Sequence, residues 1–297
     1  MTRLRSVVML PSLIVCLALV VVADSTARAE AQAARTVYVS VMDGQGAPVP
    51  DMKQDEFRVT EDGTPRTITS VERASEPIHY AILIDTTPTF SRAVSDVRAA
   101  VKAFCELLLS VDPQTQFSIV DFGGAAMTLQ DFTSDLPSIE AALGRLLPKP
   151  SESVLNEALV DAAKRMSALP PNSRKVILTI NLEPTKDATN IMVRTVAEDI
   201  RKSGAIVWSV VLQEGTRRDA NREQMLKGMT VNTGGRWVML QGAGGQSQLG
   251  GFLRSIAANS FSQYAVTFTP GEAPPKVTDV TVSREGVAAL SMKWSNQ

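Results

Sequence analysis

An aspartate followed by hydroxyl side chains is the first candidate for chemistry in this sequence. The segment Asp85-Thr86-Thr87-Pro88-Thr89 directly follows a continuous apolar run, Ile82 to Ile84. Such a run is typical of a strand that is buried on both faces of a parallel sheet. In open α/β sheets, ligands bind in the loops at the carboxyl ends of the strands. The carboxylate of Asp85 and the hydroxyls of Thr87 and Thr89 therefore form a candidate binding site.

The residue patterns of common enzymes do not accompany this segment. The one histidine, His79, lies in or just before the buried strand, which disfavours a Ser-His-Asp arrangement and a histidine-rich zinc site. Three acidic residues, Asp112, Asp121 and Asp131, are scattered over loops and strand ends without recognisable pairing. The glycine-rich stretch 242–251 lacks the strand-then-helix context of a nucleotide site, so we interpret it as a flexible loop. We expect a protein that is not an enzyme.

From His79 to about residue 261 the sequence alternates between strand and helix patterns. After Asp85, apolar residues spaced three and four apart predict a helix that packs one face on the preceding strand. Continued alternation predicts an α/β fold with a doubly wound, mostly parallel sheet of the Rossmann-like type. We expect further strands at 116–122, 127–132, 175–180, 205–212 and 237–240, and helices at 94–111, 136–147, 153–169, 188–203, 221–231 and 249–259.

Both ends of the chain carry short strand patterns instead of helical ones. These patterns lie at 36–42, 57–60 and 67–71 near the N-terminus and at 263–269, 276–283 and 287–294 near the C-terminus. Because short hairpins are marginally stable alone, we expect the two ends to pack together. The expected organisation is an N-terminal β module at 30–76, an α/β domain at 77–261 and a C-terminal β segment at 262–297.

Residues 1–29 have the pattern of a secretory signal peptide. Two arginines precede an apolar stretch, and Ala27-Arg28-Ala29 supplies a small-x-small cleavage pattern. The alternative is a retained membrane anchor, but Pro11 interrupts the apolar run and leaves it short for a spanning helix. We expect a secreted or periplasmic protein that meets a membrane only through this segment, if it stays uncleaved.

Charge and cysteine content narrow the expected partners. The formal net charge of −1 at pH 7 gives no reason to expect attraction to nucleic acid or to anionic lipid. Removal of residues 1–29 would leave Cys105 as the one cysteine. It could be a reactive thiol, but it follows Phe104 on the apolar face of a predicted helix. We therefore expect it to be a buried and inert side chain.

Several motifs along the chain carry a family resemblance. They are D-G-Q-G-A-P-V-P and D-E-F-R-V-T-E-D-G near the N-terminus, the central I-L-I-D strand, T-G-G-R-W-V before the last helix and S-Q-Y-A-V-T-F-T-P after it. Together they resemble the secreted bacterial subfamily of the von Willebrand factor type A domain. The resemblance covers nearly the whole chain after residue 29. It implies the doubly wound fold described above and a role in binding other proteins.

Domains of this family carry a metal-ion-dependent adhesion site, and the resemblance implies which residues would form it here. The family pattern D-x-S-x-S falls on Asp85, Thr87 and Thr89, with threonine in place of both serines. The second-loop threonine falls on Ser153, and the third-loop aspartate falls on Asn181. Mg²⁺ prefers oxygen ligands that include one or two carboxylates. Because Asn181 removes one carboxylate, we expect Mg²⁺, or Mn²⁺ or Ca²⁺ in its place, to bind weakly or not at all.

The same residues also have a purely structural interpretation. Asp85 could end a strand and accept backbone hydrogen bonds from the following turn. Thr89 or Ser91 could cap the next helix, and Ser153 could cap its own, because hydroxyls satisfy the unpaired amides at a helix start. Glu183 lies two positions after Asn181 and need not point toward the same site.

These observations favour a protein-binding module of the adhesion or scaffold type. Its loop face around Asp85 would engage another protein. The alternative is a structural or assembly component that binds through its β ends without metal. An envelope hydrolase is a remote alternative, because the sequence offers no catalytic constellation.

Overall fold

A six-stranded sheet forms the centre of the fold, and β5 (Ile78–Ile84) lies in its interior. The computed structural model describes residues 33–241 and 245–294, so the predicted signal peptide and residues 242–244 of the predicted glycine-rich loop lie outside the described residues. The strand order is β10-β9-β8-β5-β6-β7, and only the edge strand β7 runs antiparallel to its neighbour. The other strands are β6 (Gln116–Asp121), β7 (Met127–Thr133), β8 (Arg174–Glu183), β9 (Ile206–Gln213) and β10 (Trp237–Gln241).

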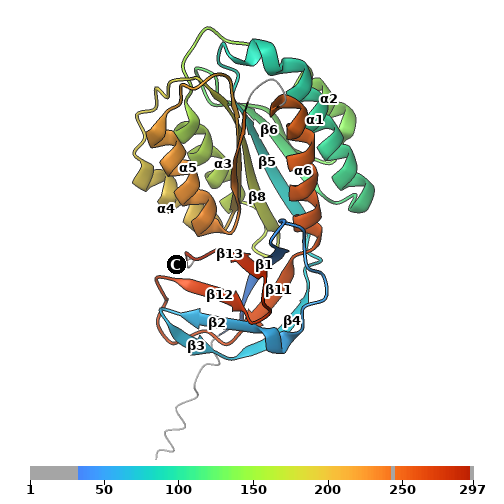
Figure 1. The fold of residues 1–297 in the computed structure, drawn as a ribbon, viewed down its shortest axis with the longest axis vertical. Helices are drawn as coiled ribbons and strands as arrows, with labels where there is room; N and C mark the ends of the chain where they lie inside the picture. Colours follow the sequence, from blue (N-terminus) through green and yellow to red (C-terminus); the bar gives the residue numbers. More distant parts are fainter. Residues whose placement is uncertain (1–32, 242–244, 295–297) are drawn as a thin grey trace, which may run out of the picture. The chain divides into compact units, whose positions relative to one another are not determined.

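Helices cover both faces of this sheet (Figure 1). One face packs against α1 (Phe90–Val111), α2 (Leu136–Gly144) and α6 (Gly245–Phe261). The opposite face packs against α3 (Leu155–Ser167), α4 (Val193–Ser203) and α5 (Ala220–Thr233). Every residue of β5 is buried, and its side chains alternate between the two cores, with Ile82 in the first and Leu83 in the second. The predicted α/β, doubly wound and mostly parallel fold is confirmed.

Strands from both ends of the chain form two further small sheets. One has the order β13-β1-β11-β4 and the other β12-β2-β3. A separate apolar core that includes Val39, Phe57 and Phe268 joins them. The strands are β1 (Arg35–Asp43), β2 (Phe57–Glu61), β3 (Thr64–Arg66), β4 (Ile68–Arg73), β11 (Tyr264–Phe268), β12 (Thr278–Val282) and β13 (Val287–Ser291), with a short 3-10 helix at Gln54–Glu56.

The β sheets meet the α/β domain near the amino-terminal ends of its parallel strands. All described residues belong to one compact unit, Ala33–Gln297. Arg174, the first residue of β8, donates hydrogen bonds to the carbonyls of Glu76 (2.9 Å) and Ser260 (2.5 Å). The Tyr80 hydroxyl donates to Ser260 Oγ at 2.6 Å. The junction therefore lies at the edge of the sheet opposite Asp85, and the β sheets leave the loops around Asp85 uncovered.

Several element boundaries differ from the sequence expectation, and the starts of α4 and α6 change the extent of a loop. α4 begins at Val193 instead of near residue 188, because the backbone at Asp187 pairs with Ser153 as an isolated β-bridge and so extends the loop after β8. α6 begins at Gly245, so most of the stretch expected to be a loop is helical. The predicted stop at Gly204 is confirmed, since this residue ends α4 in the left-handed conformation (φ 70°) that glycine tolerates best.

Cys105 is fully buried in α1, and burial raises the pKa of its thiol, as expected for an inert side chain.

Among the described residues, no helix is both long enough and apolar enough to cross a bilayer.

Candidate functional site

Asp85 stands at the carboxyl end of β5 and is completely buried. Its backbone amide donates to the carbonyl of Ile180, which continues the parallel pairing with β8. Its carboxylate accepts the amide of Thr87 at 3.0 Å and the amide of Leu182 at 3.4 Å. The carboxylate therefore ties the loop after β5 to the end of β8, which is the structural role that the sequence left open.

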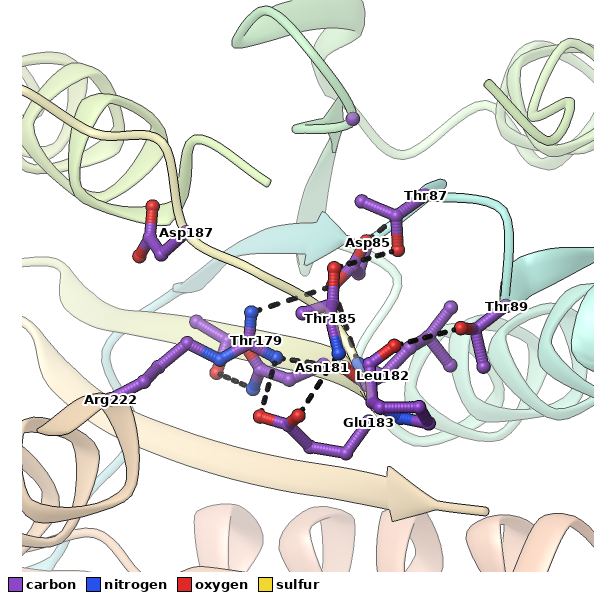
Figure 2. A network of polar contacts seen from close by, with 12 residues as sticks. Asp85, Thr87, Thr89, Thr179, Asn181, Leu182, Glu183, Thr185, Asp187 and Arg222 are labelled. Carbon is purple, nitrogen blue, oxygen red and sulfur yellow. Dashed lines mark hydrogen bonds and ion pairs between the residues drawn. The ribbon is translucent and has the colours of Figure 1, made fainter. Parts of the chain in front are cut away.

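Arg222 of α5 lies beside this carboxylate, with its side chain only 2% exposed (Figure 2). Nη1 is 3.8 Å from Oδ2 of Asp85, and Nη2 is 3.3 Å from Oε1 of Glu183. Nη2 also donates a hydrogen bond to the carbonyl of Leu182 at 2.8 Å. A buried guanidinium therefore lies between the carboxylates that follow β5 and end β8.

Burial dominates the electrostatics of the two carboxylates. Removal from water raises the pKa of Asp85, while the charge of Arg222 and the hydrogen bonds from Thr87 and Leu182 oppose this. The pKa of Glu183 is also raised, first by burial and against the effect of Arg222. The guanidinium therefore favours the ionised form of both carboxyl groups, while burial has the larger and opposite effect on their pKa values.

The two threonines of the first loop differ in their surroundings. Thr87 is buried, and its hydroxyl accepts a hydrogen bond from the hydroxyl of Thr185 at 3.2 Å. Thr89 is half-buried, and its hydroxyl donates to the carbonyl of Pro184 at 3.0 Å. Thr89 is the residue before α1, but its side chain makes no capping hydrogen bond, so the capping role considered from sequence is wrong. Both hydroxyls instead connect the first loop to the loop after β8 (Figure 2).

Asn181 directs its amide nitrogen away from Asp85 toward β9. Nδ2 donates to the carbonyl of Val210 at 3.0 Å and to the hydroxyls of Thr179 and Ser209 at 2.9 and 3.1 Å. A carbonyl oxygen can only accept, so this contact fixes which end of the amide carries the nitrogen. Oδ1 of Asn181 is buried and has no hydrogen-bond partner among the described residues.

Ser153 is held by its backbone, which forms isolated bridges to Gly123 and Asp187. Its Oγ is buried without a hydrogen-bond partner in the described part of the chain. The residue before α3 is Val154, and no side chain caps that helix, so the alternative that Ser153 caps it is also wrong. Ser153 thus offers a free hydroxyl oxygen near the loops that follow β6 and β8.

A second buried carboxylate follows the same pattern one strand away. Asp121 ends β6, and its carboxylate accepts the Thr86 hydroxyl at 2.5 Å and the Gly123 amide at 3.0 Å. Nζ of Lys149 lies 2.5 Å from its Oδ2. Position 123 requires glycine, because a Cβ there would lie 2.4 Å from Oγ1 of Thr86. Each of these two strand-end aspartates is therefore paired with a cation of the protein itself.

Asp187, on the loop between β8 and α4, titrates unusually high. Burial raises its pKa to about 6, with smaller contributions from the charges of Glu157 and Asp219, against the hydrogen bond from the Thr189 amide and the charge of Arg222. In Figure 2 its side chain lies apart from the contacts around Asp85.

His79 and Asp85 lie at opposite ends of β5, six residues apart. At ~3.3 Å per residue in a strand they are separated by about 20 Å, so they cannot act together in catalysis. The His79 ring packs edge-on against Phe132 at 5.6 Å, and burial lowers its pKa, which favours the neutral form. This histidine is a packed structural residue.

Comparisons with known proteins bear directly on this fold and loop arrangement. The family model described as von Willebrand factor type A domain matches residues 80–181. Residues 80–181 thus match the von Willebrand factor type A domain, and the α/β part of this chain has the fold of that domain. The structure is similar to proximal thread matrix protein 1 from the mussel byssus, at 13% identity and a TM-score of 0.50, over 63% of this chain and 48% of that one. It is also similar to von Willebrand factor type A from Catenulispora acidiphila, at 12% identity and a TM-score of 0.50, over 91% of this chain and 64% of that one.

A search of curated proteins finds no match.

This chain matches about half of the length of the mussel protein and about two thirds of the length of the Catenulispora protein. At these identities the two structures support the fold of the von Willebrand factor type A domain and nothing finer. The resemblance to the von Willebrand factor type A domain and the fold that it implied are confirmed, and the subfamily stays a prediction.

The adhesion-site positions of this von Willebrand factor type A domain do not fit a divalent cation. Asp85 is the one carboxylate among them, and a guanidinium already lies beside it. Asn181 directs its amide nitrogen toward β9, and the Thr89 hydroxyl is engaged by a carbonyl. The free oxygens of Asn181 and Ser153 are neutral and supply no charge. Within the described ranges, no group of three or more His, Cys, Asp or Glu could hold a metal ion.

The sequence patterns gave no indication of Arg222, the residue that changes the interpretation of this site. It lies 137 positions after Asp85, in the first turn of a helix, with no motif around it. Only the adjacency of β5, β8 and β9 brings α5 to Asp85. The one signal in the sequence is a basic residue in the first turn of a helix that follows a strand, and other residues share it.

Proposed function

We propose that this chain is a protein-binding module of the adhesion or scaffold type, without enzymatic activity. It engages its partner through the loop face, which we define as the loops at the carboxyl ends of β5, β6 and β8 together with the loop between α2 and α3, whose Lys149 amide donates to the carbonyl of Thr86. Domains of the von Willebrand factor type A family commonly mediate protein–protein interaction. The signal-peptide pattern of residues 1–29 supports a secreted or periplasmic setting.

Exposed apolar side chains on the loop face carry this proposal. Met192 is 65% exposed and Leu147 is 61% exposed, and both lie in loops at this edge of the sheet. Met127 and Val193, which begin β7 and α4 at the same edge, are also exposed. Exposed apolar groups rimmed by polar residues are a feature of protein interaction surfaces. The β sheets contact the opposite edge, so they do not cover these side chains.

A rigid base supports this face. The carboxylate of Asp85 joins the loops after β5 and β8, and the Asp121 carboxylate joins Thr86 to Lys149. Loops held by buried polar contacts lose less conformational entropy when a partner binds. The described residues offer this preformed surface without a nucleophile and base arranged for catalysis, which supports binding over hydrolysis.

A charge placed on the loop face tests the proposal. Met192→Asp should abolish capture of partners by the purified protein from an envelope extract, because an aspartate cannot be buried in an apolar contact without a large penalty. Val111→Asp is the matched control, since Val111 is 58% exposed at the end of α1 that lies at the opposite edge. Equal partner recovery with both variants, measured by quantitative mass spectrometry, would refute binding through the loop face.

The alternative is assembly through the β ends, and one observation favours it. A groove of about 680 Å³ lies against β2 and β3 and is lined by Phe57, Arg58 and Ile68 among others. β3 is also the edge of its sheet, and an open strand edge can accept a further strand. Val59→Asp would be buried and unfold the module, so Arg58→Glu in the groove is the better test. Loss of partner capture with Arg58→Glu but not with Met192→Asp would support this alternative.

A further inference from the structure

Two carboxylates at the carboxyl edge of the sheet are buried, so water cannot solvate their charge. Asp85 and Glu183 have side chains that are 0% and 4% exposed. An isolated buried carboxylate is strongly unfavourable, so such a pair needs a cation or must take up protons. A divalent ion could supply that charge, and so could a basic side chain from a neighbouring element.

The position of Arg222 is fixed from several sides. The carboxylate of Asp219 caps α5 by accepting the amides of Asn221 and Arg222, which sets where the first turn of the helix begins. The guanidinium then reaches the carbonyl of Leu182, where Nη2 donates at 2.8 Å. With 2% exposure it has no access to alternative positions in solvent. The hydrogen bond of Nη2 and the helix cap therefore hold the guanidinium beside the two carboxylates, with Nη1 facing Asp85 at 3.8 Å.

We propose that the guanidinium of Arg222 is the resident cation of this site. It supplies from within the protein the positive charge that a divalent ion would otherwise bring to Asp85 and Glu183, and it excludes such ions. The inference concerns the isolated protein and does not depend on the proposed partner or on the loop face.

Charge repulsion explains the exclusion. A divalent ion bound to Asp85 would lie ~2.0–2.6 Å from a carboxylate oxygen. Nη1 is 3.8 Å from the same carboxylate, so the ion and the guanidinium would be close neighbours in a buried environment. Lys149 beside Asp121 is a second case of the same arrangement at the next strand. Internal cations thus neutralise both strand-end aspartates.

Manganese binding to four purified proteins tests the proposal. They are the wild type, Arg222→Gln, Arg222→Lys and the control Arg218→Gln, which removes the same charge from an arginine whose side chain is 53% exposed just before α5. Free Mn²⁺ is measured by electron paramagnetic resonance during titration, after circular dichroism has verified that each variant is folded. Asp85→Asn in the Arg222→Gln background locates any new site.

The expected result is that wild type, Arg222→Lys and Arg218→Gln bind Mn²⁺ weakly and alike. Arg222→Gln should bind it at least roughly tenfold more tightly, because a neighbouring positive charge has been removed. The added Asp85→Asn should abolish that gain. A folded Arg222→Gln with unchanged affinity would overturn the proposal. If Arg222→Gln does not fold, Mn²⁺ binding by the wild type becomes the test. A wild-type Kd below about 1 mM that is lost in Asp85→Asn would overturn the proposal. No such binding by the wild type would support the proposal.

Discussion

Replacing Arg222 with methionine should strongly destabilise the folded protein. Methionine keeps much of the length and apolar stem of the arginine but carries no charge, so it isolates the effect of the guanidinium. The contacts at 3.3 Å and 3.8 Å correspond to gross attractions of about 5 and 4 kcal/mol at an effective dielectric constant of about 20. Desolvation of three buried charges offsets much of this. Removal of one partner from a buried ion pair typically costs about 3–5 kcal/mol, and we expect Arg222→Met to fall in that range.

Denaturant unfolding at pH 7, followed by circular dichroism, measures this loss through the midpoint and slope of the transition. The double variant Asp85→Asn/Arg222→Met should be less destabilised than the two single losses together, with a coupling of about 1–3 kcal/mol, because the neutral amide no longer needs a counter-ion. Arg218→Met is the exposed control and should change stability by less than about 0.5 kcal/mol. A loss below about 1 kcal/mol for Arg222→Met would refute the claim that the guanidinium neutralises the site.

Two further predictions concern other carboxylates. The pKa of Asp187 is raised from its ordinary value of 3.8 to about 6, so the folded state holds this proton more tightly; its stabilising contribution is present below pH ~4 and is lost as the pH rises through about 6. As the pH rises from 5 to 7, the free energy of unfolding of Asp187→Asn should therefore increase by about 1–2 kcal/mol relative to that of the wild type, allowing for the partial exposure of this carboxyl. Melting temperatures of the two proteins that change in parallel with pH would contradict this. Glu61 is buried in the β module between Arg35 (3.0 Å) and Arg66 (2.7 Å), so Glu61→Gln should cost about 2–4 kcal/mol in thermal unfolding. A melting temperature within a degree of wild type would show that these ion pairs contribute little.

The fold could be predicted because its cause is local and repeated. Ile82 to Ile84 are apolar at consecutive positions, so both faces of the strand must be buried against an apolar core. Helical spacing after Asp85 then required a crossover, and repetition of the unit gave the doubly wound sheet. Gly204 marked the end of α4 for the same local reason, because few other residues tolerate its conformation.

The candidate site was less predictable, because its contacts join distant segments. The sequence named Asp85, Thr87, Thr89, Ser153 and Asn181, and four of them lie on loops or strand ends that the structure connects through β5 and β8. It could not show which way the Asn181 amide faces, since that depends on the carbonyl of Val210 in the next strand.

Arg222 was beyond sequence reasoning for the same physical cause. Basic residues near a helix start are common, and only the packing of α5 against β9 and β10 makes this one a counter-ion of Asp85. Because Asn181 removes one carboxylate from the family pattern, the sequence alone predicts that Asn181→Asp would strengthen ion binding. An aspartate at this position would bring a carboxylate oxygen toward the carbonyl of Val210, and the guanidinium would still lie beside Asp85, so the gain should require the loss of Arg222 as well.

Anomalous diffraction from crystals of the wild-type protein grown or soaked in MnCl₂ tests the central claim most directly. The account predicts no manganese peak within coordination distance of the Asp85 carboxylate, with the Arg222 guanidinium lying between Asp85 and Glu183. A manganese peak bound to Asp85, with Arg222 displaced from the carboxylate, would contradict it.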